Sequence, residues 1–172
     1  ALLAQDTERG ILRFNDPKWQ AFLPKAALPA GLVITDAVHY QGDTTLVSTV
    51  KHGLFLLTPD TFTSFGVSGT SSPIHYTALR VLQDKSFYVG TYANGIYHLN
   101  ARGTVLENIN ERYGLPTNTI RCLYEDPSGT VWAGLDNGLS AIALSNGISH
   151  INPPSFSNGA GYSAYVMDNQ LY

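Results

Sequence analysis

The sequence has little cysteine and little charge. Cys122 is the only cysteine among 172 residues, so the chain cannot form an internal disulfide. It lies in an apolar run with Ile120 and Leu123, which predicts a buried core thiol. Charged residues make up 13% of the chain, about half the usual share. The net charge is −3 and there is no run of lysine or arginine, which argues against nucleic acid as a partner.

Long apolar segments and catalytic motifs are also missing. No stretch approaches the roughly 18 apolar residues of a transmembrane helix, so we expect no membrane insertion by this segment, and no signal peptide is present. The five histidines show no metal-ligand spacing, and no G-x-S-x-G, phosphate-binding or dinucleotide motif occurs. We therefore expect no catalytic residues, no metal and no cofactor in this region.

The sequence does contain a repeat, which occurs four times. Its anchors are Arg9-Gly10-Ile11, His52-Gly53-Leu54, Asn94-Gly95-Ile96 and Asn137-Gly138-Leu139, with the glycines 43, 42 and 43 residues apart. A fixed period of this size indicates one supersecondary unit copied in series. Such arrays bind and scaffold more often than they catalyse.

The clearest copy predicts four short strands. They cover residues 120–124, 130–134, 139–144 and 148–151, separated by turn-forming clusters. Asp136-Asn137-Gly138 is typical of a tight hairpin, and we expect a type I′ turn there because Asn-Gly accepts positive φ angles. Four antiparallel strands in one period of this length predict a propeller blade. The fold class is therefore all-β: a β-propeller with about four blades over residues 1–172.

Two apolar columns in the third strand of each copy support this fold. One column is Ile11, Leu54, Ile96 and Leu139, and the other is Phe14, Leu57, Leu99 and Ile142. Positions three apart on a strand face opposite sides. Both faces of every sheet are therefore expected to be buried, as they are when each blade lies between two neighbours.

A fifth copy begins at about residue 162 and does not finish. Residues 162–167 read as a first strand, Asp168-Asn169 as a turn and residues 170–172 as the start of a second strand. The chain also opens in a second strand, so both ends suggest a piece of a longer protein. Two arrangements are open: a closed four-bladed ring, or an arc of a larger propeller. We favour the arc, because residues 1–3 and 170–172 would compete for one strand position.

The segment Tyr113-Gly114-Leu115-Pro116-Thr117-Asn118-Thr119-Ile120, continued by residues 125–134 and Asn137-Gly138-Leu139, resembles the two-component regulator propeller repeat. That pattern is roughly G-L-P-x-N-x-I, an acidic D-x-x-G turn, W-x-G-T and N-G-L. Residues 84–96 are similar, whereas Leu135 replaces the usual threonine and Gln5-Asp6 replaces Gly-Thr in the first copy.

The resemblance implies a partial seven-bladed propeller from the periplasmic or extracellular sensor region of a bacterial histidine kinase. Its partners would be a small-molecule or oligosaccharide ligand, the remaining blades, downstream sensor and kinase domains, and a second copy in a homodimeric parent. Two alternatives remain open: a propeller lyase resembling the virginiamycin-inactivating family, or a structural adaptor of a surface-secretion apparatus. The lyase would need His39, His75 or His150 beside a carboxylate.

Loops over a rigid scaffold are where binding residues concentrate. The loops between second and third strands emerge at the same end as the blade-to-blade connections. Aromatic and amide side chains there suit a polyhydroxylated ligand, because rings stack on sugar faces and amides bond hydroxyls. The candidate ligand-binding residues are Trp19, His52, Tyr92, Asn94, Tyr113 and Asp136.

Two carboxylates in the fourth copy are expected to be structural. Asp126 and Trp132 are spaced somewhat as in the aspartate box of sialidases, but the spacing to Gly129 differs, so we interpret them as a turn acid and a blade tryptophan. Glu125 and Asp126 are adjacent on a strand and point to opposite faces, so they cannot flank one bond as a general acid–base pair.

Overall fold

The computed structural model describes residues 2–70, 74–143, 147–151, 166–167 and 170–171, and it is built from short strands. Blade 1 contains β1 (Leu2–Asp6), β2 (Gly10–Asn15) and β3 (Lys18–Pro24). Blade 2 contains β4 (Ile34–Gln41), β5 (Thr44–Thr49), β6 (Leu54–Leu57) and β7 (Phe62–Phe65). Blade 3 contains β8 (Tyr76–Val81), β9 (Phe87–Thr91), β10 (Ile96–Leu99) and β11 (Val105–Ile109). Blade 4 contains β12 (Ile120–Glu125), β13 (Val131–Leu135), β14 (Gly138–Ala143) and β15 (Gly147–Ile151).

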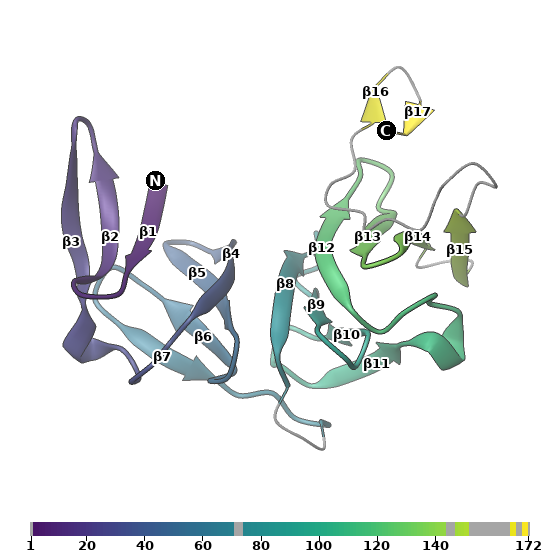
Figure 1. Ribbon diagram of the computed structural model, residues 1–172, viewed down its shortest axis with the longest axis horizontal. Helices are drawn as coiled ribbons and strands as arrows, with labels where there is room; N and C mark the ends of the chain where they lie inside the picture. The colour runs from purple at the N-terminus through teal and green to yellow at the C-terminus, as the bar shows by residue number, and fades with distance from the viewer. Residues whose placement is uncertain (1, 71–73, 144–146, 152–165, 168–169, 172) are drawn as a thin grey trace.

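Each blade is a separate antiparallel sheet whose strands pair in chain order. The first strands of neighbouring blades lie beside one another, with β8 between β4 and β12 and in contact with both (Figure 1). The all-β propeller architecture is therefore confirmed, and the predicted strands match the observed ones to within one or two residues.

The apolar core lies between the blades. Three clusters of buried side chains each draw residues from two adjacent blades. Central members are Ile11 and Val47 between blades 1 and 2, Leu54 and Phe87 between blades 2 and 3, and Tyr88 and Ile120 between blades 3 and 4. Each sheet is therefore covered by its neighbours.

The two apolar columns face opposite sides, as predicted. On β6, Leu54 belongs to the cluster between blades 2 and 3, whereas Leu57 belongs to the cluster between blades 1 and 2. Phe14 and Leu139 are only half-buried. They lie on the outer flanks of blades 1 and 4, which no described blade covers.

Side chains at the end of the second strands close the turns to the third strands. Thr91 Oγ1 donates to the Gly95 carbonyl at 2.7 Å and accepts from the Asn94 N–H at 2.9 Å. Thr49 bonds to Gly53 and His52 in the same way. In blade 1 an aspartate, Asp6, stands where the other two blades have these threonines. Its carboxylate accepts from the Glu8 and Arg9 N–H groups, so it closes the turn as the threonines do.

The turn at Asp136-Asn137 is a two-residue hairpin, as predicted, but it is not type I′. Leu135 pairs with Gly138 across it, and only Gly138 takes a positive φ, of 99°. A type I′ turn needs positive φ at both central residues. The glycine after the turn absorbs the left-handed conformation, so Asp136 and Asn137 need not adopt it.

Polar side chains also tie neighbouring blades together. The carboxylate of Asp36 on β4 accepts from the Leu79 N–H of β8 at 2.8 Å. Gln5 on β1 donates to the Leu32 carbonyl at 2.7 Å and accepts from the Ile34 N–H at 2.9 Å. These bonds fix the position of one blade relative to the next.

The beginning of the fifth copy forms its own hairpin. β16 (Val166–Met167) pairs with β17 (Gln170–Leu171), while residues 162–165 and the predicted turn at residues 168–169 lie outside the described part. This pair is a separate sheet and does not join β1 (Figure 1). The described residues thus show an open arc of blades.

Two further features complete the fold. Cys122 is half-buried, less than predicted, and burial raises the pKa of its thiol.

The helices in the described part are two single turns, η1 (Lys25–Ala27) and η2 (Glu111–Tyr113), and neither has the length or apolarity to cross a membrane.

Candidate functional site

Five of the six candidate residues lie at one end of the propeller, which we call the connection end. It carries the turns between second and third strands and the connections between blades. His52, Tyr92, Asn94 and Asp136 lie in those turns, and Tyr113 lies in η2, in the connection from blade 3 to blade 4. The opposite end, the hairpin end, carries the turns between first and second strands.

Tyr92 and Asn94 are held by the backbone. The Tyr92 N–H donates to the His75 carbonyl at 3.0 Å, and the Tyr92 carbonyl accepts from the Thr119 hydroxyl. The Asn94 carbonyl accepts from Asn108 Nδ2 at 2.9 Å. Tyr92 remains 56% exposed, so the turn presents a fixed aromatic residue to solvent.

The connection that carries Tyr113 is ordered by asparagines. Asn110 Oδ1 caps η2 by accepting from the Arg112 N–H, and Asn118 Oδ1 accepts from the Glu111 N–H, both at 2.9 Å. Leu115 is 3% exposed and anchors the segment in the core between blades 3 and 4. Tyr113 itself is 67% exposed. The connection thus projects an aromatic ring from a rigid loop.

A shallow cleft of about 470 Å³ lies beside Tyr113. Its other walls are Leu106, Glu107, Asn108, Asn110 and Arg112. Sequence reasoning named Tyr113 but missed the asparagines. The sequence does contain a signal for them, because asparagine occurs at the alternate positions 108 and 110, at the end of β11 and just after it. Alternate residues share one face of a strand, so the two asparagines could have been expected on the same face.

His52 and Asp136 are less available to a ligand. His52 is half-buried, and its Nδ1 has no hydrogen-bond partner among the described residues. Asp136 is paired with Arg121 on β12. A ligand would have to compete with this ion pair for the Asp136 carboxylate.

Trp19 does not lie at the connection end. It lies on β3, next to the turn between β2 and β3, and that turn emerges at the hairpin end. Its ring packs against Phe14 with centroids 5.2 Å apart and stays 42% exposed. The expectation that Trp19 lies at the end of the blade-to-blade connections was wrong, because β3 begins at Lys18 and the connection starts only after Pro24.

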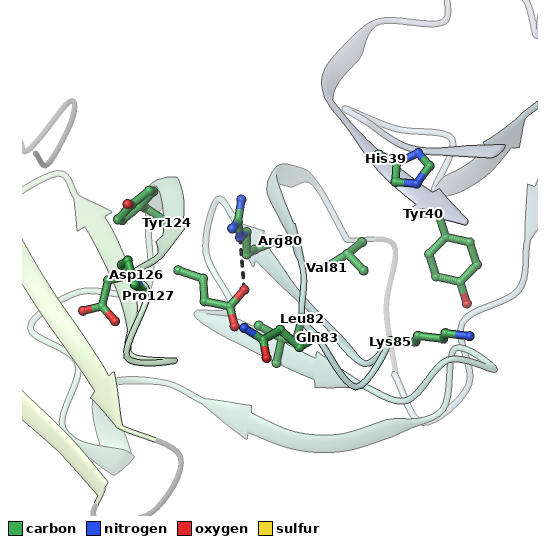
Figure 2. Close-up of a pocket in the computed structure, with 11 residues that line it drawn as sticks. His39, Tyr40, Arg80, Val81, Leu82, Gln83, Lys85, Tyr124, Asp126 and Pro127 are labelled. Carbon is green, nitrogen blue, oxygen red and sulfur yellow. Dashed lines mark ion pairs between the residues drawn. The ribbon is translucent and has the colours of Figure 1, made fainter. Parts of the chain in front are cut away.

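A larger cleft, of about 580 Å³, opens at the hairpin end (Figure 2). It lies where β4, β8 and β12 end, and blades 2, 3 and 4 all contribute to it. Arg80 of β8 and Glu125 of β12 face each other in it, with 3.5 Å between Nε and Oε2. No single repeat contains this site, so no local motif could reveal it.

Asp126 has a structural role in its turn, as the sequence indicated. One carboxylate oxygen accepts from the Ser128 N–H, the Ser128 hydroxyl and the Thr130 N–H, and the other accepts from Trp132 Nε1 at 2.9 Å. Both carboxylate oxygens therefore accept hydrogen bonds within the blade.

Histidines in the described part do not join a group that could hold a metal ion. No cluster of three or more histidine, cysteine or acidic side chains suited to a metal occurs among the described residues. His39 and His75 are exposed, and neither bonds to a described carboxylate. The side chain of His150 lies outside the described part.

Among the histidines whose side chains are described, His98 is the one with both a side-chain hydrogen-bond partner and a shifted pKa. Its Nε2 lies 2.9 Å from the Ser86 hydroxyl and its ring stacks on Tyr88 at 4.5 Å. Burial lowers the pKa of His98, and the charges of Asp84 and Glu107 offset this only in part.

We expect the free energy of unfolding to fall as pH drops below about 6.5, the ordinary pKa of histidine. In that range the unfolded chain binds a proton at His98 that the folded chain resists, so the folded state loses stability until pH passes the lowered pKa. Urea unfolding at pH 7 and pH 5 measures this. His98→Phe should flatten the dependence, whereas Tyr97→Phe on the same strand should keep the wild-type slope. An unchanged slope in His98→Phe would contradict the assignment.

One segment of the repeat matches a known protein family. The family model described as two component regulator propeller matches residues 114–137. These residues include the Gly114-Leu115-Pro116 motif and the Asp126 turn, so the resemblance found in the sequence is confirmed over this segment. No curated protein sequence matches the chain.

Solved structures show the same fold. The extracellular domain of the putative hybrid two component system BT3049 from B. thetaiotaomicron aligns with a TM-score of 0.70 and 16% identity, over 88% of this chain and 21% of that one. The extracellular domain of the putative one component system BT4673 from the same organism aligns with a TM-score of 0.71 and 20% identity, over 95% and 23%. The WD40 β-propeller domain of Doa1 aligns with a TM-score of 0.64 and 18% identity, over 93% and 58%. The chain thus spans between 21% and 23% of the length of the two bacterial domains.

Proposed function

We propose that this chain is a non-catalytic, ligand-sensing part of a β-propeller from the extracytoplasmic region of a bacterial two-component sensor. It lies in the periplasm or outside the cell, and its ligand is an oligosaccharide or a similar neutral molecule. The match to the two component regulator propeller family and the likeness to extracellular domains of putative hybrid two component systems support this role. In this proposal, further blades and the output domains belong to a longer parent chain.

The observation that carries the proposal is the pair of exposed tyrosines at the connection end. Tyr92 and Tyr113 project from turns fixed by backbone and asparagine hydrogen bonds. Rigid aromatic rings offer contact area at low entropic cost, as binding surfaces require. The cleft beside Tyr113 adds polar groups within reach of a sugar.

Calorimetric titration with a panel of neutral oligosaccharides tests this function. We expect one of them to bind, and Tyr113→Ala to weaken its binding roughly tenfold, or about 1.4 kcal/mol. Tyr113→Phe should keep most of the affinity, because the ring remains. Trp19→Ala is the matched control, since it removes an exposed ring at the other end. Absence of binding across the panel, or an equal loss in Trp19→Ala, would refute the proposal.

A further inference from the structure

The outer face of blade 1, which no described blade covers, is apolar. One row across β1, β2 and β3 is Leu2, Phe14 and Trp19, and the next row is Ala4, Leu12 and Ala21. The intervening residues Leu3 and Ile11 belong to the cluster between blades 1 and 2, so the two rows lie on the other side of the sheet. Leu2 is 60% exposed and Trp19 is 42% exposed. A surface without charged side chains therefore faces solvent in the single chain.

The corresponding face of blade 2 is a contact between blades. One repeat of 43 residues further along the chain, the counterparts of Leu12, Phe14 and Trp19 are Phe55, Leu57 and Phe62. All three belong to the cluster between blades 1 and 2 or pack against it. Blade 2 therefore uses this face to pack on the blade before it. The same positions of blade 1 suit the same kind of contact.

Blade 4 leaves the complementary face uncovered. Its outer row across β12, β13 and β14 is Tyr124, Trp132 and Ala141, and Leu139 lies on the same face. The row at this place in blade 2 is Val38, Leu46 and Leu56, which lies in the cluster between blades 2 and 3. Tyr124 is 41% exposed, and Trp132 and Leu139 are half-buried. This is therefore the face with which a blade receives the blade after it.

A second copy of the chain can cover both faces. Blades 1 and 4 are separate sheets at opposite ends of the described arc (Figure 1). Two different faces that fit one another join copies head to tail, and they form a ring where the rotation closes. Propellers typically hold about four to eight blades, so two copies, with about eight, stay within this range and three copies exceed it.

We propose that the chain associates head to tail with a second copy, with the outer face of blade 1 in each copy packed on the outer face of blade 4 in the other. Phe14 and Trp19 then lie against Trp132 and Leu139, and both copies bury their uncovered rows. Trp19 is thus an interface residue, which accounts for an exposed ring on the outer face of blade 1. This association is independent of the proposed function, in whose longer parent chain a further blade would take the same place.

Sedimentation equilibrium over a range of protein concentrations tests the proposal. We expect the mass to rise from that of one chain, 18.6 kDa, to twice that value. Trp19→Glu should weaken the association by roughly tenfold or more, because aromatic residues carry much of the free energy of an interface. Leu2→Glu tests the same face at a more exposed position if Trp19→Glu does not fold. Leu106→Glu, which adds the same charge at an exposed position of β11, should leave the association unchanged.

A charge on blade 4 distinguishes head-to-tail packing from contact between two copies of blade 1. Leu139→Glu should also weaken the association, whereas contact between two copies of blade 1 would not respond to it. Mixing Leu139→Glu with Trp19→Glu should restore a dimer, because the intact blade 1 of one variant fits the intact blade 4 of the other. Circular dichroism checks that each variant is folded, and Tyr124→Glu replaces Leu139→Glu if that variant is not. A single-chain mass at every concentration, full association in Trp19→Glu, or no recovery on mixing folded variants would overturn the proposal.

Discussion

Replacement of Gly95 by alanine is expected to lower the free energy of unfolding by about 3 kcal/mol or more. Gly95 has a φ of 74°, where an L residue is strained by roughly 1–2 kcal/mol. A Cβ at this position would also lie 3.0 Å from Asn110 Cα and would overlap the Ile109 carbonyl oxygen. Forcing atoms into an occupied space costs roughly a further 1–3 kcal/mol. Chemical denaturation of the wild-type protein and of Gly95→Ala measures this difference in the free energy of unfolding.

Gly53 is the matched control for this prediction. It occupies the same slot of the repeat with a φ of 88°, but nothing lies within 4 Å of the place its Cβ would take. Gly53→Ala should therefore cost only about 1–2 kcal/mol, from backbone strain alone. Equal losses at Gly53 and Gly95 would show that the close approach of the Ile109 carbonyl has no energetic consequence.

Phe87→Ala is expected to destabilise the protein by about 3–5 kcal/mol, as large-to-small changes in tightly packed cores do. Phe87 is fully buried on β9, where it faces blade 2. Its ring meets Phe65 edge-on at 5.7 Å and Tyr40 at 6.3 Å. The change would remove a fully buried ring that packs on two aromatic rings of blade 2, and urea unfolding monitored by circular dichroism would detect it.

Leu106→Ala controls for the removal of apolar atoms in general. Leu106 is 57% exposed on β11, so its loss should change the unfolding free energy by less than about 0.5 kcal/mol. If Phe87→Ala were also tolerated at under about 1 kcal/mol, the inter-blade cluster would not hold these blades together.

The repeat made most of the fold predictable. The glycine period located the third strands, and the two apolar columns showed that both sheet faces are covered, as Leu54 and Leu57 confirm. The turn type at Asp136-Asn137 was wrong because sequence alone does not show which residue of Asn-Gly takes the positive φ. The structure assigns it to Gly138 alone.

The candidate sites were less predictable. Tyr92 and Tyr113 were placed correctly at the connection end because their loops could be located once the strands were known. Trp19 was misplaced because the length of the turn before β3 was not apparent. The hairpin-end cleft was missed because Arg80 and Glu125 belong to different copies of the repeat, and only the curvature of the array brings them together.

The location of the apolar clusters has a consequence for how such a protein comes apart. Since every cluster is shared by two adjacent sheets, no blade carries a complete core of its own, and stability accumulates from one neighbour to the next. Within the described arc, blades 2 and 3 pack against a neighbouring blade on both faces. Blade 1 packs against a neighbour on one face, and Phe14 on its other face is only half-buried. We therefore expect fraying to begin at the margins of the described arc and to proceed inward.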